Sequence, residues 1–167
     1  MADRTVTLYS ASKSFNMGGM CCALAHIGPD KLLRDLAALP GHLLGRVSLP
    51  SVATTLACWS AEGDRWLERC LTRLRGNRAV LAQWLEGPGG SAGVRALLPE
   101  ATYLAWLDFR PAGLGTDPAA ALLAEAKVAL SPGPAFGPGG EGFARLNFAT
   151  SPGLLEQLLS RLAGALT

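Results

Sequence analysis

The chain has 167 residues, which is enough for one domain with a buried core; 49% of its residues are hydrophobic and 17% are charged. The formal net charge is +2, and the lysines and arginines form no cluster with interleaved aromatic residues, which argues against nucleic-acid binding. No apolar stretch approaches the roughly 20 residues of a membrane helix, and the first residues contain no apolar signal core.

The first part of the sequence predicts two strands followed by three helices. In chain order, strands are expected over 5–9 and 21–27, and helices over 30–39, 50–59 and 64–86. The segment 21–27 is continuously apolar, which is typical of a strand in a sheet covered on both faces. Asp30 is expected to cap the first helix, and Gly76 with Asn77 is expected to interrupt the third as a hinge or domain boundary.

The second part predicts a small α/β domain. After a flexible Gly-rich connection over 87–93, strands are expected over 103–109, over 128–130 and from Phe143, and helices over 118–127 and from Pro152. Ser151 is the expected N-cap of the last helix, with Pro152 at its first position. The apolar stripe of this helix consists of Leu155, Leu158, Leu159, Leu162 and Leu166.

Several conspicuous residues are not expected to carry chemistry. His26 and His42 have no clear acidic partner, and the Gly- and Pro-rich segment 132–142 lacks the Walker pattern, so that we expect a loop that closes over a substrate or a simple turn. The cysteines have neither Cys-x-x-Cys spacing nor histidine partners at zinc-ligand distances; they are Cys21, Cys22, Cys58 and Cys70. We interpret them as buried thiols of a soluble cytoplasmic protein without a metal site.

Lys13 is the residue whose setting suggests chemistry. It follows the first predicted strand, lies between Ser12 and Ser14, and precedes a Gly-rich turn. A neutral lysine amine attacks aldehydes, and the hydroxyls and backbone amides of such a turn bind phosphate. From the residues alone, a surface lysine in a Ser-rich turn is the simpler interpretation.

Four segments, in order along the chain, resemble one known family. The segment 7–20 (TLYSASKSFNMGGM) resembles the cofactor-lysine segment of class I/II aminotransferase-like enzymes of pyridoxal-phosphate (PLP) fold type I. Its Ser-Lys-Ser-Phe-Asn form resembles the branch of cystathionine β-lyases of the MalY/PatB kind. The other three segments are 101–109 (ATYLAWLDF), 128–137 (VALSPGPAFG) and 142–149 (GFARLNFA).

This resemblance implies roles for four residues. Lys13 matches the lysine that forms the Schiff base with PLP and later moves the Cα proton. Ser10 matches a hydroxyl that binds the cofactor phosphate, with Ser12 assisting, and Arg145 matches the arginine that binds the substrate α-carboxylate. A planar guanidinium suits a carboxylate, and the predicted strand places Arg145 on the face opposite Leu146. Without the resemblance, an arginine on the solvent face of a strand would be commonplace.

The implied fold is α/β: residues 1–76 would form the end of the large PLP-binding domain with a linking helix, and 77–167 the small C-terminal domain. The implied activity is a PLP-dependent carbon–sulfur β-lyase that converts cystathionine or a cysteine conjugate to a thiol, pyruvate and ammonia. A class I/II aminotransferase is the alternative, and a non-catalytic α/β interaction module is an alternative of another class. The full-length relative is expected to be a homodimer.

The sequence departs from the family in two respects. Many aminotransferases of this superfamily carry a phosphate-binding arginine at the position of Cys21, and the lyase branch often lacks it. Family members also have a long portion before the lysine, which includes the acidic partner of the cofactor ring nitrogen. We therefore expect a fragment, a truncated reading frame or a degenerate paralogue, with reduced or absent activity.

Overall fold

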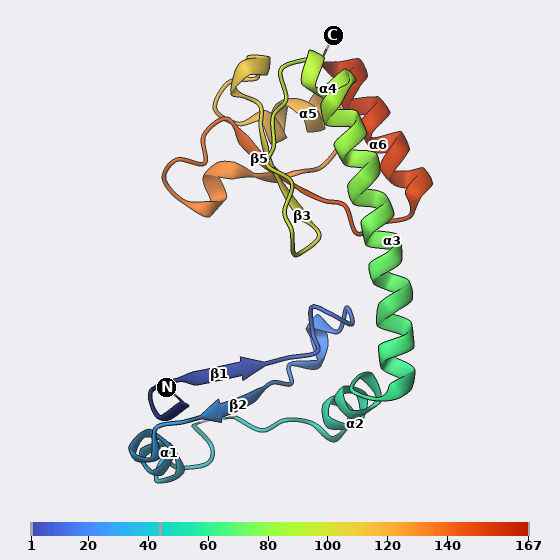
Figure 1. The fold of residues 1–167 in the computed structure, drawn as a ribbon. Coiled ribbons are helices and arrows are strands. Elements are labelled where there is room, and N and C mark those ends of the chain that lie inside the picture. Colours follow the sequence, from blue (N-terminus) through green and yellow to red (C-terminus); the bar gives the residue numbers. More distant parts are fainter. Residues whose placement is uncertain (1, 44, 167) are drawn as a thin grey trace. The chain divides into compact units, whose positions relative to one another are not determined.

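The computed structural model describes residues 2–43 and 45–166, and Figure 1 shows the order of their helices and strands. The chain divides into two compact units, Met1–Cys70 and Leu71–Thr167. The assignment of domains to 1–76 and 77–167 stays a prediction. No helix among the described residues is long and apolar enough to cross a membrane.

The first unit contains a two-stranded antiparallel sheet and short helices. Its elements are β1 (Val6–Tyr9), β2 (Leu24–Ile27), α1 (Asp30–Ala37), α2 (Leu49–Cys58) and the 3₁₀ turns Ala2–Arg4 and Gly18–Met20. The strands pair with Val6 opposite Ile27. Helix α2 begins where the Ser48 side chain accepts a hydrogen bond from the Ser51 backbone N–H, with proline in its first turn.

Three details of this unit differ from the prediction. The strand expected over 21–27 begins only at Leu24 and is not covered on both faces within the unit; it pairs with β1 alone, and the Leu24 side chain is 55% exposed. Asp30 is the first residue of α1, where its carboxylate lies at the positive end of the helix, and Pro29 occupies the N-cap. Cys21 is exposed, so the prediction of buried thiols is wrong for it, and the other cysteines are half-buried; all four are free.

Helix α3 (Ala61–Glu86) continues without a break through Gly76 and Asn77, contrary to the predicted interruption. A helical glycine costs only about 1 kcal/mol relative to alanine, so a long helix tolerates one. Asn77 is 1% exposed, and its amide donates hydrogen bonds of 2.8 Å to the backbone oxygens of Phe148 and Thr150. Asn77 therefore anchors α3 to the end of the last strand in the second unit.

The second unit is a three-stranded antiparallel sheet with helices against one face. Its elements are β3 (Leu104–Asp108), β4 (Ser131–Pro132), β5 (Phe143–Asn147), α4 (Pro88–Ser91), α5 (Pro118–Ala126), α6 (Pro152–Ala165) and the 3₁₀ turns Arg110–Ala112 and Gly133–Phe136. The strand order is β3-β5-β4. The N-cap prediction for α6 is confirmed, since the Ser151 hydroxyl accepts a hydrogen bond from the Leu154 N–H.

The core of this unit lies between one sheet face and the helices. Ala105 and Leu107 of β3 and Ala144 and Leu146 of β5 point into it, because alternate strand residues share a face. The helices contribute Leu81, Leu122, Leu155, Leu159 and Leu162. Alternate residues of the same strands therefore lie on the opposite face, which we call the open face of the sheet; they include Trp106, Asp108, Phe143, Arg145 and Asn147.

Two further predictions for this unit are wrong. The Gly-rich connection over 87–93 contains the short helix α4, which begins with Pro88. The strand expected over 128–130 lies further along the chain, as β4 at Ser131–Pro132. The reason is that α5 ends at Lys127 in a left-handed conformation (φ 55°), after which Val128 turns into the core, 5% exposed, and does not join the sheet.

Candidate functional site

The turn after β1 brings two serine hydroxyls together. The Oγ atoms of Ser10 and Ser12 are 2.7 Å apart, and the Ser12 backbone N–H donates to the Ser10 Oγ at 3.2 Å. The Ser10 hydroxyl also donates to the backbone oxygen of Cys22, at 3.0 Å. This network holds the turn against the segment that leads into β2, and it leaves hydroxyl groups on an exposed surface.

Lys13 follows this hydroxyl pair directly and is exposed. Within the described part of the chain its side chain has no hydrogen bond or ion pair. The backbone beneath it is ordered, because Ala11 is 1% exposed and its oxygen accepts from the Phe15 N–H at 3.0 Å. Phe15 in turn stacks on Trp66, with ring centroids 5.7 Å apart. The side chain of Lys13 thus has no partner among the described residues and projects from a turn whose backbone is hydrogen-bonded.

Arg145 lies in the second unit, at the middle of β5 and directly opposite Trp106 of β3. As predicted, it points away from the buried Ala144 and Leu146. Its guanidinium donates through Nη2 to the Ser131 Oγ at 3.2 Å, and the guanidinium carbon lies 4.7 Å from the centroid of the Phe136 ring. Its Nε is buried and has no hydrogen-bond partner among the described residues.

A second arginine on the same face provides a contrast. Asp108 accepts from Nε and Nη2 of Arg110 at 2.9 and 2.8 Å, and the guanidinium carbon of Arg110 lies 4.5 Å from the Phe143 ring centroid. The hydrogen bonds from Arg110 hold the pKa of Asp108 below its ordinary value, although burial opposes this, and raise the pKa of Arg110. No carboxylate among the described residues pairs with Arg145 in this way.

An unpaired, half-buried arginine with an orphaned donor fits an external carboxylate. A buried N–H without an acceptor costs free energy, and an anion that accepts from Nε and Nη would remove this cost. The charge of Arg110 is already balanced by Asp108, so the two arginines are not equivalent. On the open face, Arg145 is therefore the residue suited to bind a carboxylate.

The sequence analysis missed the surroundings of Arg145. Trp106 is 36% exposed and meets the Phe136 ring edge-on, with centroids 5.3 Å apart. Ser131 and Phe136 lie in the segment 128–137, one of the four that resemble the family. This resemblance was the one signal in the sequence that pointed to these two residues. Nothing local showed that these residues meet Arg145, because the contacts depend on the pairing of β3 and β4 with β5.

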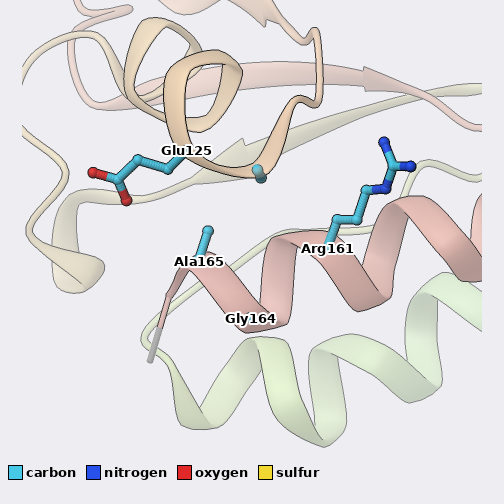
Figure 2. A pocket seen from close by; sticks show the side chains of 5 residues that line it. Glu125, Arg161, Gly164 and Ala165 are labelled. Carbon is cyan, nitrogen blue, oxygen red and sulfur yellow. The ribbon is translucent and has the colours of Figure 1, made fainter.

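We also searched the described residues for a metal site and for a pocket. The described residues contain no group of three or more histidine, cysteine, aspartate or glutamate residues that could hold a metal ion. A shallow pocket between α5 and α6 is lined by Glu125, Ala126, Arg161, Gly164 and Ala165, and none of the predicted site residues lines it. Figure 2 shows that the charged ends of Glu125 and Arg161 point away from each other.

The fold agrees with comparisons to known proteins. Residues 1–162 match the model of the family described as aminotransferase class I and II. The chain belongs to this family, and the predicted α/β class of PLP fold type I is confirmed by structures that match 99% of its length.

Within the family, the chain is similar to carbon–sulfur lyases, as predicted. It is 37% identical to the cystathionine beta-lyase PatB of Bacillus subtilis over 169 residues, which cover 99% of the chain and 43% of PatB. Identity to the protein MalY of Escherichia coli is 34%, over 95% of the chain and 41% of MalY. A PLP-bound C-S lyase of Staphylococcus hominis superimposes with a TM-score of 0.86 at 28% identity, over 99% of the chain and 40% of that enzyme. The chain thus spans less than half the length of these relatives.

Proposed function

We propose that this chain carries the cofactor-binding lysine and the substrate-binding arginine of a PLP-dependent carbon–sulfur β-lyase. The substrate would be cystathionine or another cysteine conjugate, and the products a thiol, pyruvate and ammonia. The observation that carries the proposal is the free amine of Lys13 directly after the Ser10–Ser12 hydroxyl pair, in a chain that matches lyases over nearly its whole length. We further propose a cytoplasmic location and a homodimer for the full-length protein.

Ser10, Ser12 and Lys13 fit the cofactor. The hydroxyls of Ser10 and Ser12 are 2.7 Å apart, and each could donate to an oxygen of one phosphate group once its proton turns away from its present acceptor, which for Ser10 is the Cys22 backbone oxygen. The exposed Lys13 amine can bind an aldehyde. When bound, PLP supplies an electron sink that stabilises negative charge at the substrate Cα. Ser10 and Ser12 would hold the phosphate, and Lys13 would hold the aldehyde end.

Two side chains of this chain would act on the substrate. Arg145 would bind the substrate α-carboxylate through Nε and Nη, which orients the amino acid and satisfies the buried Nε. The amine of Lys13 would act as the base that removes the proton from the substrate Cα. The electron pair left at Cα would expel the β-thiolate, and one water would hydrolyse the remaining unsaturated amine to pyruvate and ammonia.

Addition of PLP to the purified chain tests the proposal. We expect a visible absorption band for the wild-type chain, and loss of that band in Lys13→Ala. Lys31→Ala is the matched control, because Lys31 is also an exposed lysine of the first unit but is paired with Asp35. A wild-type chain without the band, or a Lys13→Ala chain that retains it, would overturn the assignment of Lys13 and favour a non-catalytic module.

An aminotransferase is the second candidate, because the family model that matches the chain is that of class I and II aminotransferases. The two activities would use the same lysine and arginine and differ in where the proton goes after it leaves Cα. Product analysis with cystathionine separates them: a lyase yields pyruvate and a thiol, whereas an aminotransferase yields the keto acid of the intact substrate.

A further inference from the structure

The open face of the sheet holds two arginines, each stacked on an aromatic ring, but only one has a counter-ion. Arg110 lies over Phe143 and is paired with Asp108, whereas Arg145 lies over Phe136 and has no carboxylate partner among the described residues. The Arg145 guanidinium is therefore held by a ring and by the Ser131 hydroxyl, and not by charge pairing. Such support orders the guanidinium without neutralising it.

We propose that Phe136 is a positioning residue for Arg145, whose ring keeps the guanidinium in place so that a carboxylate meets donors that are already ordered. The inference rests on the proposed role of Arg145 as the carboxylate-binding residue. An arginine side chain loses rotamer entropy when it is fixed by a ligand. A guanidinium that is stacked beforehand has lost part of this entropy already, which strengthens carboxylate binding.

Phe136 is itself held in place, although its side chain is 51% exposed. Trp106 meets its ring edge-on with centroids 5.3 Å apart, and Trp106 is the cross-strand partner of Arg145. Three residues from the two strands and the intervening loop thus form one stacked group on the open face. Exposure to water does not stabilise a phenylalanine ring. Its contacts with Trp106 and Arg145 therefore account for the position of the Phe136 ring.

The loop that carries Phe136 is closed by a tight backbone approach. A Cβ atom at Gly133 would lie 2.1 Å from the backbone oxygen of Gly140, and one at Gly140 would lie 2.1 Å from that of Gly133, so both positions require glycine. Within the loop, the Gly137 N–H donates to the Pro134 oxygen at 3.2 Å. The close approach of Gly133 to Gly140 therefore closes the loop that carries Phe136.

Side-chain NMR of the full chain tests the contact without cofactor or activity. An aromatic ring shifts the resonances of protons stacked on it, and Arg145→Lys identifies the signals of Arg145. We expect Phe136→Leu to move the Arg145 Hδ and Hε resonances towards those of an exposed arginine, and Phe136→Tyr to leave them near the wild-type values. Leu123→Ala is the matched control, because Leu123 on α5 is 52% exposed and is not stacked on an arginine. If Phe136→Leu leaves the Arg145 resonances unchanged, the proposal fails.

The effect on carboxylate binding is tested by titrating the PLP-loaded chain with L-cystathionine and measuring the change in its visible absorption spectrum. Loss of one cation–π contact at a partly exposed site should weaken binding about two- to fivefold in Phe136→Leu, and Phe136→Tyr should restore it. Equal affinities of wild type and Phe136→Leu would overturn the positioning role. A different result, an Arg145→Lys chain that binds L-cystathionine as wild type does, would overturn the proposed function of Arg145 itself, whatever the resonances show.

Discussion

The side-chain amide of Asn77 on α3 donates a 2.8 Å hydrogen bond to the backbone oxygen of Phe148, at the end of the strand that carries Arg145. The same amide donates to the Thr150 oxygen, also at 2.8 Å. Both acceptors belong to the segment between β5 and α6, and the Phe148 oxygen also accepts from the Thr150 N–H at 3.0 Å. One buried side chain thus satisfies two backbone groups and ties the long helix to the sheet.

Asn77→Ala should therefore destabilise the second unit. Removal of the amide takes a donor from both backbone oxygens, although the Phe148 oxygen keeps the Thr150 N–H at 3.0 Å, and the loss of such hydrogen bonds costs about 1–3 kcal/mol. Urea unfolding should show a lower midpoint, while Gln83→Ala on the exposed side of the same helix should stay within about 0.5 kcal/mol of wild type. Equal destabilisation by the two variants would mean that helix propensity, and not the buried hydrogen bonds, determines the effect.

Arg145 and Arg110 should differ sharply in substrate binding. Charge-assisted hydrogen bonds contribute about 1.5–3 kcal/mol each, so Arg145→Gln should weaken the binding of an amino-acid substrate to the PLP-loaded chain by about 10- to 150-fold. Arg110→Gln should have little effect, because Asp108 already occupies that guanidinium. Spectral titration with L-cystathionine measures both, and a large loss in Arg110→Gln would contradict the assignment.

Ser10→Ala should weaken the binding of PLP. The Ser10 Oγ accepts from the Ser12 N–H, lies 2.7 Å from the Ser12 Oγ and donates to the Cys22 oxygen, so its loss loosens the turn and would remove one of the two proposed phosphate donors. A net hydrogen bond of about 0.5–1.5 kcal/mol corresponds to a two- to tenfold rise in the dissociation constant. Titration of the visible band with PLP provides the measurement, with Ser14→Ala as control because Ser14 is an exposed serine on the other side of Lys13. A greater loss in Ser14→Ala would place the phosphate elsewhere.

The Asp108–Arg110 pair should make stability depend on pH only in acid. The pKa of Asp108 is lowered from 3.8 chiefly by hydrogen bonds from Arg110. A carboxyl whose folded pKa is depressed contributes stability above its unfolded pKa, and this contribution is lost as the pH falls through the folded value. The loss therefore begins as the pH falls below about 4. Urea midpoints at about pH 6 and about pH 3 should differ less in Asp108→Asn than in wild type, and an unchanged difference would show that the pair contributes nothing.

Much of the secondary structure is predictable because its causes are local. The N-cap of α6 depends on Ser151 and Pro152, and the alternation of β5 determines which side of the strand Arg145 occupies. The family-specific turn around Lys13 is likewise contained in one short segment of sequence. For Lys13, Ser10, Ser12 and Arg145, the assigned roles stay predictions until the experiments above are done.

The errors concern features that depend on distant residues. The strand expected over 128–130 forms instead at Ser131–Pro132, because its position depends on pairing with β5 and on the turn at Lys127. The helix break expected at Gly76 does not occur, since the neighbouring Asn77 is anchored by residues more than seventy positions away. Propensity alone could not reveal either effect.

The sequence by itself determined the family, the α/β class and the turn that presents Lys13. These features depend on motifs and on periodicity among residues that are close together in the sequence. Only the tertiary structure decided how Arg145 is held. Its ring support, its hydroxyl partner and the absence of a counter-ion among the described residues arise where β3, β4 and the loop before β5 converge. Cross-strand register and loop closure bring these groups together, and both are set by packing and hydrogen bonding between segments far apart in the chain.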